Sequence, residues 1–131
     1  MEAPRLVLMA HGSCDPRWCA PFERFVSTLK ADLGAHKVRL AYMEFVTPTL
    51  VDIAAEAMRD GVQHLQILPM FMAGGAHVDR DIPEQVAAIQ ARFPALALTV
   101  LPPIGEHPRV VALMQDIVRA HADSALAESK E

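Results

Sequence analysis

At residues 5–13 the chain reads RLVLMAHGS, an almost continuous apolar run that ends in a histidine, a glycine and a serine. An apolar run of this length, bounded by turn residues, is typical of a strand that is buried on both faces of a parallel sheet. His11 would then stand directly after the strand, at its carboxyl end. Open α/β sheets bind their ligands at that edge, so His11 is a candidate functional residue.

Two further apolar runs end in the same kind of place. Residues 38–43 lead to Glu44, and residues 65–72 lead through a turn of small residues, 73–76, to His77. If the three runs are neighbouring parallel strands, all three polar side chains emerge at one edge. Two imidazoles and one carboxylate leave coordination positions open for a substrate, whereas closed structural sites use more protein ligands, usually thiolates. The pattern therefore predicts a divalent-metal site formed by His11, His77 and Glu44.

Each of these residues also has a plainer explanation. Glycines around the two histidines serve tight turns, and histidines or exposed glutamates at strand ends are common without any function. It is the joint placement of the three residues that favours the metal site.

Strand and helix patterns alternate four times along the chain. Strands are expected at residues 5–10, 38–44, 63–71 and 96–101, and helices at 21–33, 47–59, 79–93 and 108–122. This alternation predicts an α/β fold with three layers, α/β/α, around a four-stranded parallel sheet of order 2-1-3-4. In the last helix, Val110, Leu113, Met114 and Ile117 share one face, which we expect to pack inside.

Length and composition set further limits. The 131 residues predict one domain over residues 1–123, with a polar and frayed tail at 124–131. A net charge of −4 without a basic stripe argues against nucleic-acid binding. Neither an apolar stretch of membrane-spanning length nor a leader is apparent, so no membrane association is expected. Cys14 and Cys19 fit no zinc pattern and are expected to be reduced, as in a cytoplasmic protein.

Other polar and aromatic side chains follow the strands. Arg17, Arg80 and Arg109 would suit a carboxylate-rich ligand, although arginines near helix starts are usually just solvated. Trp18 could form the wall of a site for a flat ligand, but packing is its commoner role. For His107 we expect turn formation and helix initiation, and the remaining histidines are expected at the surface: His36, His64 and His121.

Four segments resemble a known family: LVLMAHGSCDPR (6–17), AYMEFVTPTL (41–50), ILPMFMAGGAHVDRDIP (67–83) and PPIGEHP (102–108). They are similar to class II tetrapyrrole chelatases, and within these to the short CbiX-type sirohydrochlorin cobaltochelatases and the SirB-type ferrochelatases. The resemblance runs from about Leu6 to the last helix. It implies that His11 and His77 bind the metal, with Glu44 beside them. The implied activity is ATP-independent insertion of Co²⁺, or of Ni²⁺ or Fe²⁺, into sirohydrochlorin or a related tetrapyrrole.

The same resemblance implies partners and contacts. The metal is a substrate, and no organic cofactor is expected. Ser13, Arg17, Gly75 and Arg80 are the expected tetrapyrrole contacts. Double-length members hold two copies of the domain facing one another, which implies a homodimer for a chain of one copy. This chain departs from the family pattern at Cys14, where many members have arginine, and that leaves a local substrate contact in doubt.

The residues argue against two other functions and leave a third open. Histidine phosphatases place an arginine directly before His-Gly, but Ala10 stands there. A flavodoxin-like mononucleotide binder would need a phosphate-cradling glycine-rich loop after the first strand, where residues 14–16 read CDP. A non-catalytic protein that binds or delivers cobalt or nickel remains open. So does the identity of the histidine that accepts a pyrrole proton.

Overall fold

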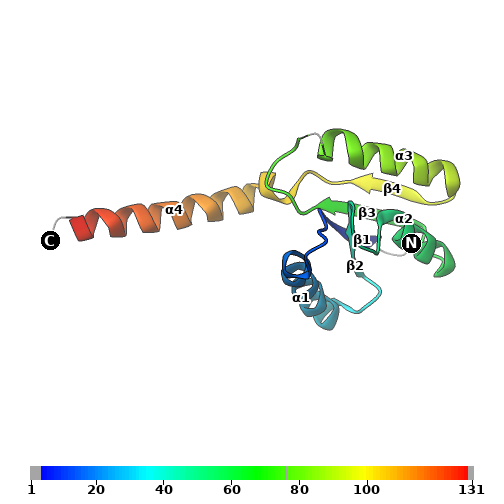
Figure 1. The fold of residues 1–131 in the computed structure, drawn as a ribbon, viewed down its shortest axis with the longest axis horizontal. Coiled ribbons are helices and arrows are strands. Elements are labelled where there is room, and N and C mark those ends of the chain that lie inside the picture. The colour runs from blue at the N-terminus through cyan, green and yellow to red at the C-terminus, as the bar shows by residue number, and fades with distance from the viewer. Residues whose placement is uncertain (1–3, 76, 130–131) are drawn as a thin grey trace.

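Four parallel strands form the centre of the molecule. The computed structural model describes residues 4–75 and 77–129, without the side chains of 77–78 and 124–129. Strands β1 (Arg5–Ala10), β2 (Val38–Tyr42), β3 (His64–Pro69) and β4 (Ala97–Val100) pair in the order β2-β1-β3-β4 (Figure 1). All three pairings are parallel. The predicted sheet and its strand order are confirmed, and the order reverses between β1 and β3.

The helices lie close to their predicted positions, with differences at three of their starts. Helix α1 (Pro16–Leu33) begins five residues before the predicted start, and α2 (Leu50–Arg59) begins three residues after its predicted start, where Thr49 caps its first turn. The earlier start of α1 is explained by Asp15, whose carboxylate accepts the backbone N–H of Arg17 and so caps the helix. Helix α3 (Ile82–Arg92) begins later than predicted, because the preceding residues wind into a π-helical turn, η1 (His77–Asp81).

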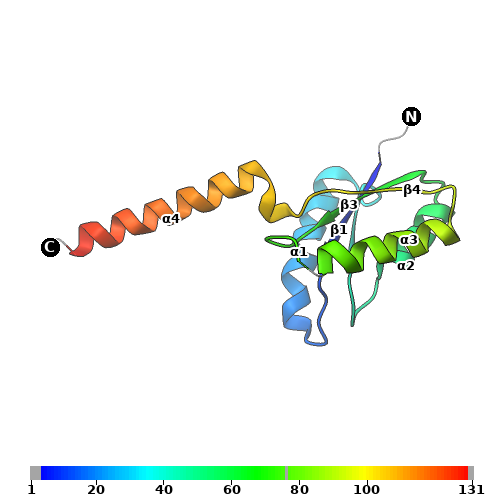
Figure 2. The same ribbon diagram turned by 90° about the horizontal axis from the view of Figure 1, so that it is seen from above.

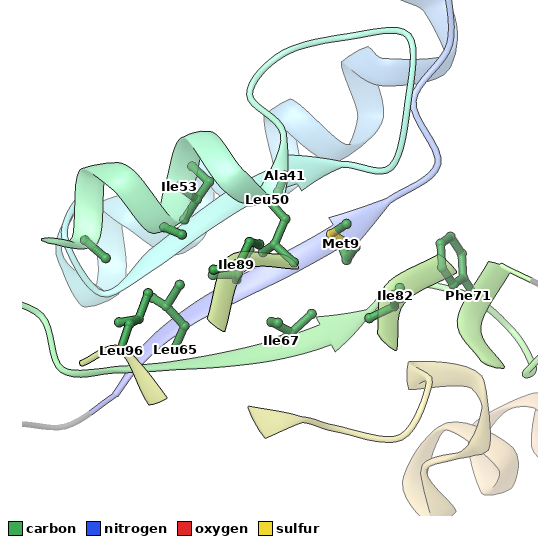
Figure 3. Close-up of a cluster of buried hydrophobic side chains, with 13 residues drawn as sticks. Met9, Ala41, Leu50, Ile53, Leu65, Ile67, Phe71, Ile82, Ile89 and Leu96 are labelled. Atoms are coloured by element: carbon green, nitrogen blue, oxygen red, sulfur yellow. The ribbon is translucent and has the colours of Figure 1, made fainter. Parts of the chain in front are cut away.

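Two apolar clusters hold helices on both faces of the sheet, as predicted for three layers. On one face α2 and α3 bury side chains against β1 and β3, among them Met9, Ile53, Ile67, Ile82 and Ile89 (Figure 3). On the other face α1 packs against β1 and β2. The strands alternate between the clusters, as the period of two requires. The rigid sheet therefore fixes the positions of the loops that leave its carboxyl edge.

The last helix does not pack as predicted. A short 3₁₀ turn, η2 (Ile104–Glu106), leads into α4 (Pro108–Ser129), which projects away from the sheet (Figures 1 and 2). Leu113 and Ile117, expected inside, are 58% and 49% exposed, while Val110 and Met114 are half-buried. The expectation was wrong because the turn directs the helix outward instead of back across the sheet. None of the helices in the described ranges is long and apolar enough to span a membrane.

Candidate metal centre

His11 follows β1 directly and is exposed at the carboxyl edge of the sheet. Its ring lies against Phe71, with the ring centroids 4.3 Å apart and the planes inclined by 46°. Phe71 follows β3 and is itself buried in the cluster under α2 and α3. Because one side of the imidazole lies against a buried ring, its orientation is restricted, although the residue as a whole is exposed.

The loop that carries Glu44 continues the pairing of β1 with β2. Beyond the strand ends, Met43 N–H donates to the carbonyl of Ala10 (2.8 Å) and Glu44 N–H donates to the carbonyl of His11 (3.2 Å). Gly12 has a φ of +86°, and a Cβ on it would collide with the carbonyl oxygen of Glu44. Only glycine allows this close approach in this conformation. The backbones of His11 and Glu44 are therefore held side by side.

The side chains of these two residues line different hollows. Glu44 lines a hollow of about 360 Å³ together with Asp81 and Glu84, whereas His11 lines one of about 310 Å³ together with Trp18. Among the side chains that the structure describes, no group of three His, Cys, Asp or Glu residues is arranged to hold a metal ion. Of the three predicted ligands, His11 and Glu44 are therefore neighbours through their backbones, while their side chains line separate hollows.

The third predicted ligand, His77, has a side chain outside the described part of the structure. Its backbone opens η1, in the connection between β3 and α3, at the carboxyl edge that also carries His11. The N–H of Asp79 donates to the carbonyl of Gly75 (2.7 Å), which helps to form the turn. Participation of His77 in a metal site stays a prediction.

The four predicted tetrapyrrole contacts differ in how they are held. Ser13 Oγ accepts the backbone N–H of Asp15. Arg17 is ion-paired with Asp15 at 2.6 Å. The guanidinium lowers the pKa of Asp15, and the carboxylate raises the pKa of Arg17. Gly75 and Arg80 are exposed on the loop after β3. All four remain predictions as substrate contacts.

Several residues at the edge were missed by the sequence analysis or assigned a different role. Trp18 is not packed but 72% exposed beside His11. Phe71, Asp81 and Glu84 received no functional role, although the strand order could have placed Phe71 beside His11. Asp81 and Glu84 stand at the start of α3, where no local pattern in the sequence points toward Glu44.

Tyr42 closes β2 and lies beneath the hollow that His11 lines. Its hydroxyl donates to Glu23 Oε1 of α1 at 3.1 Å. Burial raises the pKa of Tyr42 well above its ordinary value, and the bond to Glu23 adds to the increase. The phenol is therefore a neutral structural donor that ties α1 to the edge of the sheet.

His107 acts at the start of α4, as predicted. Its Nδ1 accepts the backbone N–H of Arg109 at 3.1 Å, which satisfies one of the unpaired donors of the first turn. His64 Nε2 lies 2.8 Å from Thr99 Oγ1, in a link between β3 and β4. The hydrogen bonds of these two histidines thus serve the structure.

The chain thus combines a parallel α/β sheet with a histidine and a glutamate in adjoining loops at the carboxyl edge of that sheet. The sequence profile of the CbiX family matches residues 5–121. The chain belongs to the CbiX family.

Similar proteins carry chelatase names. The chain is 25% identical over 118 residues to the chloroplastic sirohydrochlorin ferrochelatase of Arabidopsis thaliana, covering 90% of this chain and 52% of that protein. It is also 25% identical to the sirohydrochlorin cobaltochelatase of Sulfurisphaera tokodaii, covering 86% and 89%. The chain spans about half the length of the ferrochelatase relatives, with 52% and 41% covered in Arabidopsis thaliana and Bacillus subtilis.

Solved structures share the fold. The putative cobalamin (vitamin B12) biosynthesis CbiX protein from Marinobacter aquaeolei VT8 superposes with a TM-score of 0.80 at 29% identity, covering 95% of this chain and 98% of that one. The sirohydrochlorin chelatase SirB from Bacillus subtilis subspecies spizizenii, in complex with cobalt, has a TM-score of 0.70 at 23% identity, covering 79% and 44%. The second likeness supports the fold alone.

Proposed function

We propose that this protein inserts a divalent metal ion, Co²⁺ foremost and otherwise Ni²⁺ or Fe²⁺, into sirohydrochlorin or a related tetrapyrrole without ATP. The observation that carries the proposal is the placement of exposed His11 and exposed Glu44 in adjoining loops at the carboxyl edge, in a chain of the CbiX family. His11, His77 and Glu44 are the proposed metal ligands. Imidazole and carboxylate together suit these ions, and an incomplete set leaves room for the macrocycle.

Charge around Glu44 supports the approach of a cation. Glu44, Asp81 and Glu84 line one hollow, and acidic groups gathered there would raise the local concentration of divalent ions. These carboxylates would attract the ion, and His11 would receive it one loop away.

Apolar side chains at the same edge suit the faces of a macrocycle. Trp18, Phe45 and Met72 are 72%, 69% and 61% exposed. Trp18 lines the hollow of His11, Phe45 follows Glu44, and Met72 follows Phe71, whose ring lies against His11. Large exposed aromatic and thioether groups lose unfavourable contact with water when a flat ring system covers them. Ser13, Arg17, Gly75 and Arg80 are the proposed polar contacts at its rim.

The remaining chemical requirement is that the macrocycle releases protons when the metal enters. The insertion exchanges two pyrrole protons for one M²⁺, so two protons have to leave the macrocycle as the metal–nitrogen bonds form. An imidazole that releases the metal becomes free to accept a proton near neutral pH, and a carboxylate can pass it to water. In this proposal His11 or His77 acts first as ligand and then as base, and Glu44 relays the proton.

A second copy of the chain completes the proposed cleft. The ferrochelatase relatives are about twice as long as the matched region, which supports a homodimer of a chain this size. The proposed location is the cytoplasm, where exposed Cys14 and buried Cys19 would remain thiols, as they are in the structure.

Anaerobic incubation of the protein with sirohydrochlorin and Co²⁺, Ni²⁺ or Fe²⁺ in turn, followed by absorbance, tests the proposal. We expect the spectrum of the metallated macrocycle to develop faster than in a protein-free control with at least one metal. If no metal is inserted above the uncatalysed rate but Co²⁺ or Ni²⁺ binds to the protein, the activity is refuted in favour of a metal-binding or delivery protein.

A further inference from the structure

Within the part of the chain that the structure describes, no other element covers the apolar side of the long helix α4 or one face of the sheet. Apolar side chains recur along α4 at helical spacing, and Leu113, Ile117 and Val118 are 58%, 49% and 65% exposed. We call residues 108–129 the α4 arm. Its opposite side carries polar groups, including an ion pair between Arg119 and Asp116. This is the pattern of a helix that packs along one side, yet the arm extends away from the sheet (Figures 1 and 2).

The uncovered face of the sheet lies over β3 and β4. Leu98 of β4 and Leu96 just before the strand point into the cluster under α3, so Ala97 and Thr99 point to the other face, where both are exposed. Gln66 pairs with Thr99 across the strands and is half-buried. We call the surface formed by Gln66, Ala97 and Thr99 the open sheet face. Helix α1 packs on this same side of the sheet, but against β2 and β1.

The direction of the α4 arm is set by contacts at its base. Gly105 N–H donates to the carbonyl of Phe71 at 3.0 Å, and a Cβ on Gly105 would collide with the backbone of Met72. His107 caps the first turn through the N–H of Arg109. The turn is therefore locked against the loop after β3, and the arm leaves the molecule in a defined direction.

From these observations we infer that two copies of this chain exchange their α4 arms, so that each arm covers the open sheet face of the other copy. Both uncovered surfaces belong to one chain, and among its described residues they do not meet. The arm continues roughly in the direction in which β3 and β4 run (Figure 1). In a copy related by a two-fold axis beyond the carboxyl edge, the strands run the opposite way. The arm would then lie antiparallel to them, as helices do in βα units.

The size of the contact is sufficient for a dimer. The arm has 22 residues, and a helix of that length extends about 33 Å at about 10 Å diameter, which exceeds the roughly 20 Å length of the six-residue β3 and the roughly 13 Å length of the four-residue β4. Counting helix and sheet surfaces for two arms, the exchange buries on the order of 1,000 Å², the size that a specific interface has to reach. The exchange also brings the two carboxyl edges, and with them the two His11 loops, toward each other.

Site-specific cross-linking tests the exchange. With Cys14→Ser and Cys19→Ala as background, Ile117→Cys on the arm and Thr99→Cys on the open sheet face are joined by a short bis-maleimide. We expect doubly cross-linked chain pairs of twice the 14.3 kDa chain mass on a denaturing gel. Intrachain products of single mass would show that the arm folds back on its own sheet and would overturn the inference.

A matched pair of charge variants provides a second measurement. Leu113→Asp with Ile117→Asp places two carboxylates on the apolar side of the arm, and Ala112→Asp with Gln115→Asp places the same charge on its polar side. By sedimentation equilibrium we expect the first variant to be at least tenfold weaker in dimerisation and the second to match the wild type. Equal dimerisation of both variants, or a monomeric wild type, would contradict the exchange. Circular dichroism checks that each variant is folded.

The inference concerns the homodimer proposed above, so its failure has to be separable from failure of the chelatase activity. Metal insertion is measured on the same samples. A double-cysteine variant that gives cross-linked pairs but inserts no metal, like a wild type that inserts none, refutes the activity alone. A double-cysteine variant that inserts metal but gives no cross-linked pairs refutes the exchange alone.

Discussion

The imidazole of His11 rests on the ring of Phe71 at a centroid distance of 4.3 Å, so a group proposed to bind metal is positioned by a residue of the core. Aromatic contacts of this kind contribute about 0.5–1.5 kcal/mol beyond the burial of area. The contact also links two loops across the point where the strand order reverses. The orientation of His11 therefore depends on the loop that leads toward His77.

Replacement of Phe71 by leucine should reduce metal insertion more than it reduces stability. Loss of the flat support lets the His11 ring sample other orientations, so we expect kcat to fall about tenfold while the free energy of unfolding falls by about 1 kcal/mol. Phe93→Leu is the matched control, because Phe93 packs against the same core but does not touch His11. Insertion kinetics and urea unfolding are measured on both variants. Equal activity in the two would contradict a positioning role for Phe71.

Removal of the proposed ligands should abolish activity and leave the fold intact. For His11→Ala and for His77→Ala we expect the insertion rate to fall by about 10²–10⁴-fold, since ligand and base functions are both lost. Isothermal titration with Co²⁺ should show weaker binding in each. His36→Ala, at an exposed histidine far along the chain from either, should keep both properties. Near-normal turnover in either ligand variant would refute the assignment.

The sheet could be predicted from the sequence because strands that are buried on both faces consist almost entirely of apolar residues. Short continuous apolar runs bounded by turn residues are typical of strands covered on both faces, and their alternation with helices restricts the order to a few choices. That order predicted that His11 and Glu44 lie at the same edge of the sheet. In the structure the backbone N–H of Glu44 donates to the carbonyl of His11.

Two kinds of feature could not be predicted from the sequence: the direction in which α4 leaves the sheet, and contacts between residues far apart in the chain. The apolar side of α4 was correctly found, but the pattern cannot distinguish packing within one chain from packing against another surface. The contact of Phe71 with His11 joins residues 60 positions apart in the chain, and Asp81 and Glu84 reach the hollow of Glu44 only through the path of η1. Contacts between residues so far apart in the chain produce no periodic pattern in the sequence.

Gly12→Ala should disturb the fold at the proposed centre. An alanine there faces the cost of positive φ, about 1 kcal/mol, and its Cβ also collides with the carbonyl of Glu44. We expect a loss of about 3 kcal/mol in unfolding free energy, by urea denaturation, together with loss of insertion. Gly61→Ala is the control, since Gly61 also has positive φ (+75°) but a Cβ there has no neighbour within 4 Å. A similar loss in both variants would show that the collision is relieved at no cost.

Phe45 offers a test of backbone strain beside Glu44. It has a φ of +71°, and the N–H of Val46 donates to the carbonyl of Glu44 across it at 2.9 Å, a tight and strained turn. Phe45→Gly and Phe45→Ala both remove the exposed ring, but only glycine tolerates the backbone. We expect the glycine variant to be about 1 kcal/mol more stable than the alanine variant by urea unfolding. Equal stabilities would indicate that the turn carries no strain.

Tyr42, the single tyrosine of the chain, should titrate only at strongly alkaline pH. Burial and the bond to Glu23 raise its pKa in the folded state above the value of about 10 that applies to the unfolded chain. Its contribution to stability is therefore complete below about pH 10 and is lost as pH rises through the folded-state pKa. Near-ultraviolet absorbance of the folded protein should show no tyrosinate at pH about 10, where a denatured sample is half ionised.

Tyr42→Phe isolates this effect from the titration of lysines. At neutral pH the variant should lose about 1 kcal/mol, the usual contribution of one hydrogen bond. Between pH about 9 and about 11 its unfolding free energy should fall less steeply than that of the wild type, because phenylalanine has no proton to release in the unfolded state. Parallel slopes for the two proteins, measured by urea unfolding, would mean that the phenol ionises equally in both states. The hydroxyl would then not be held by burial and Glu23.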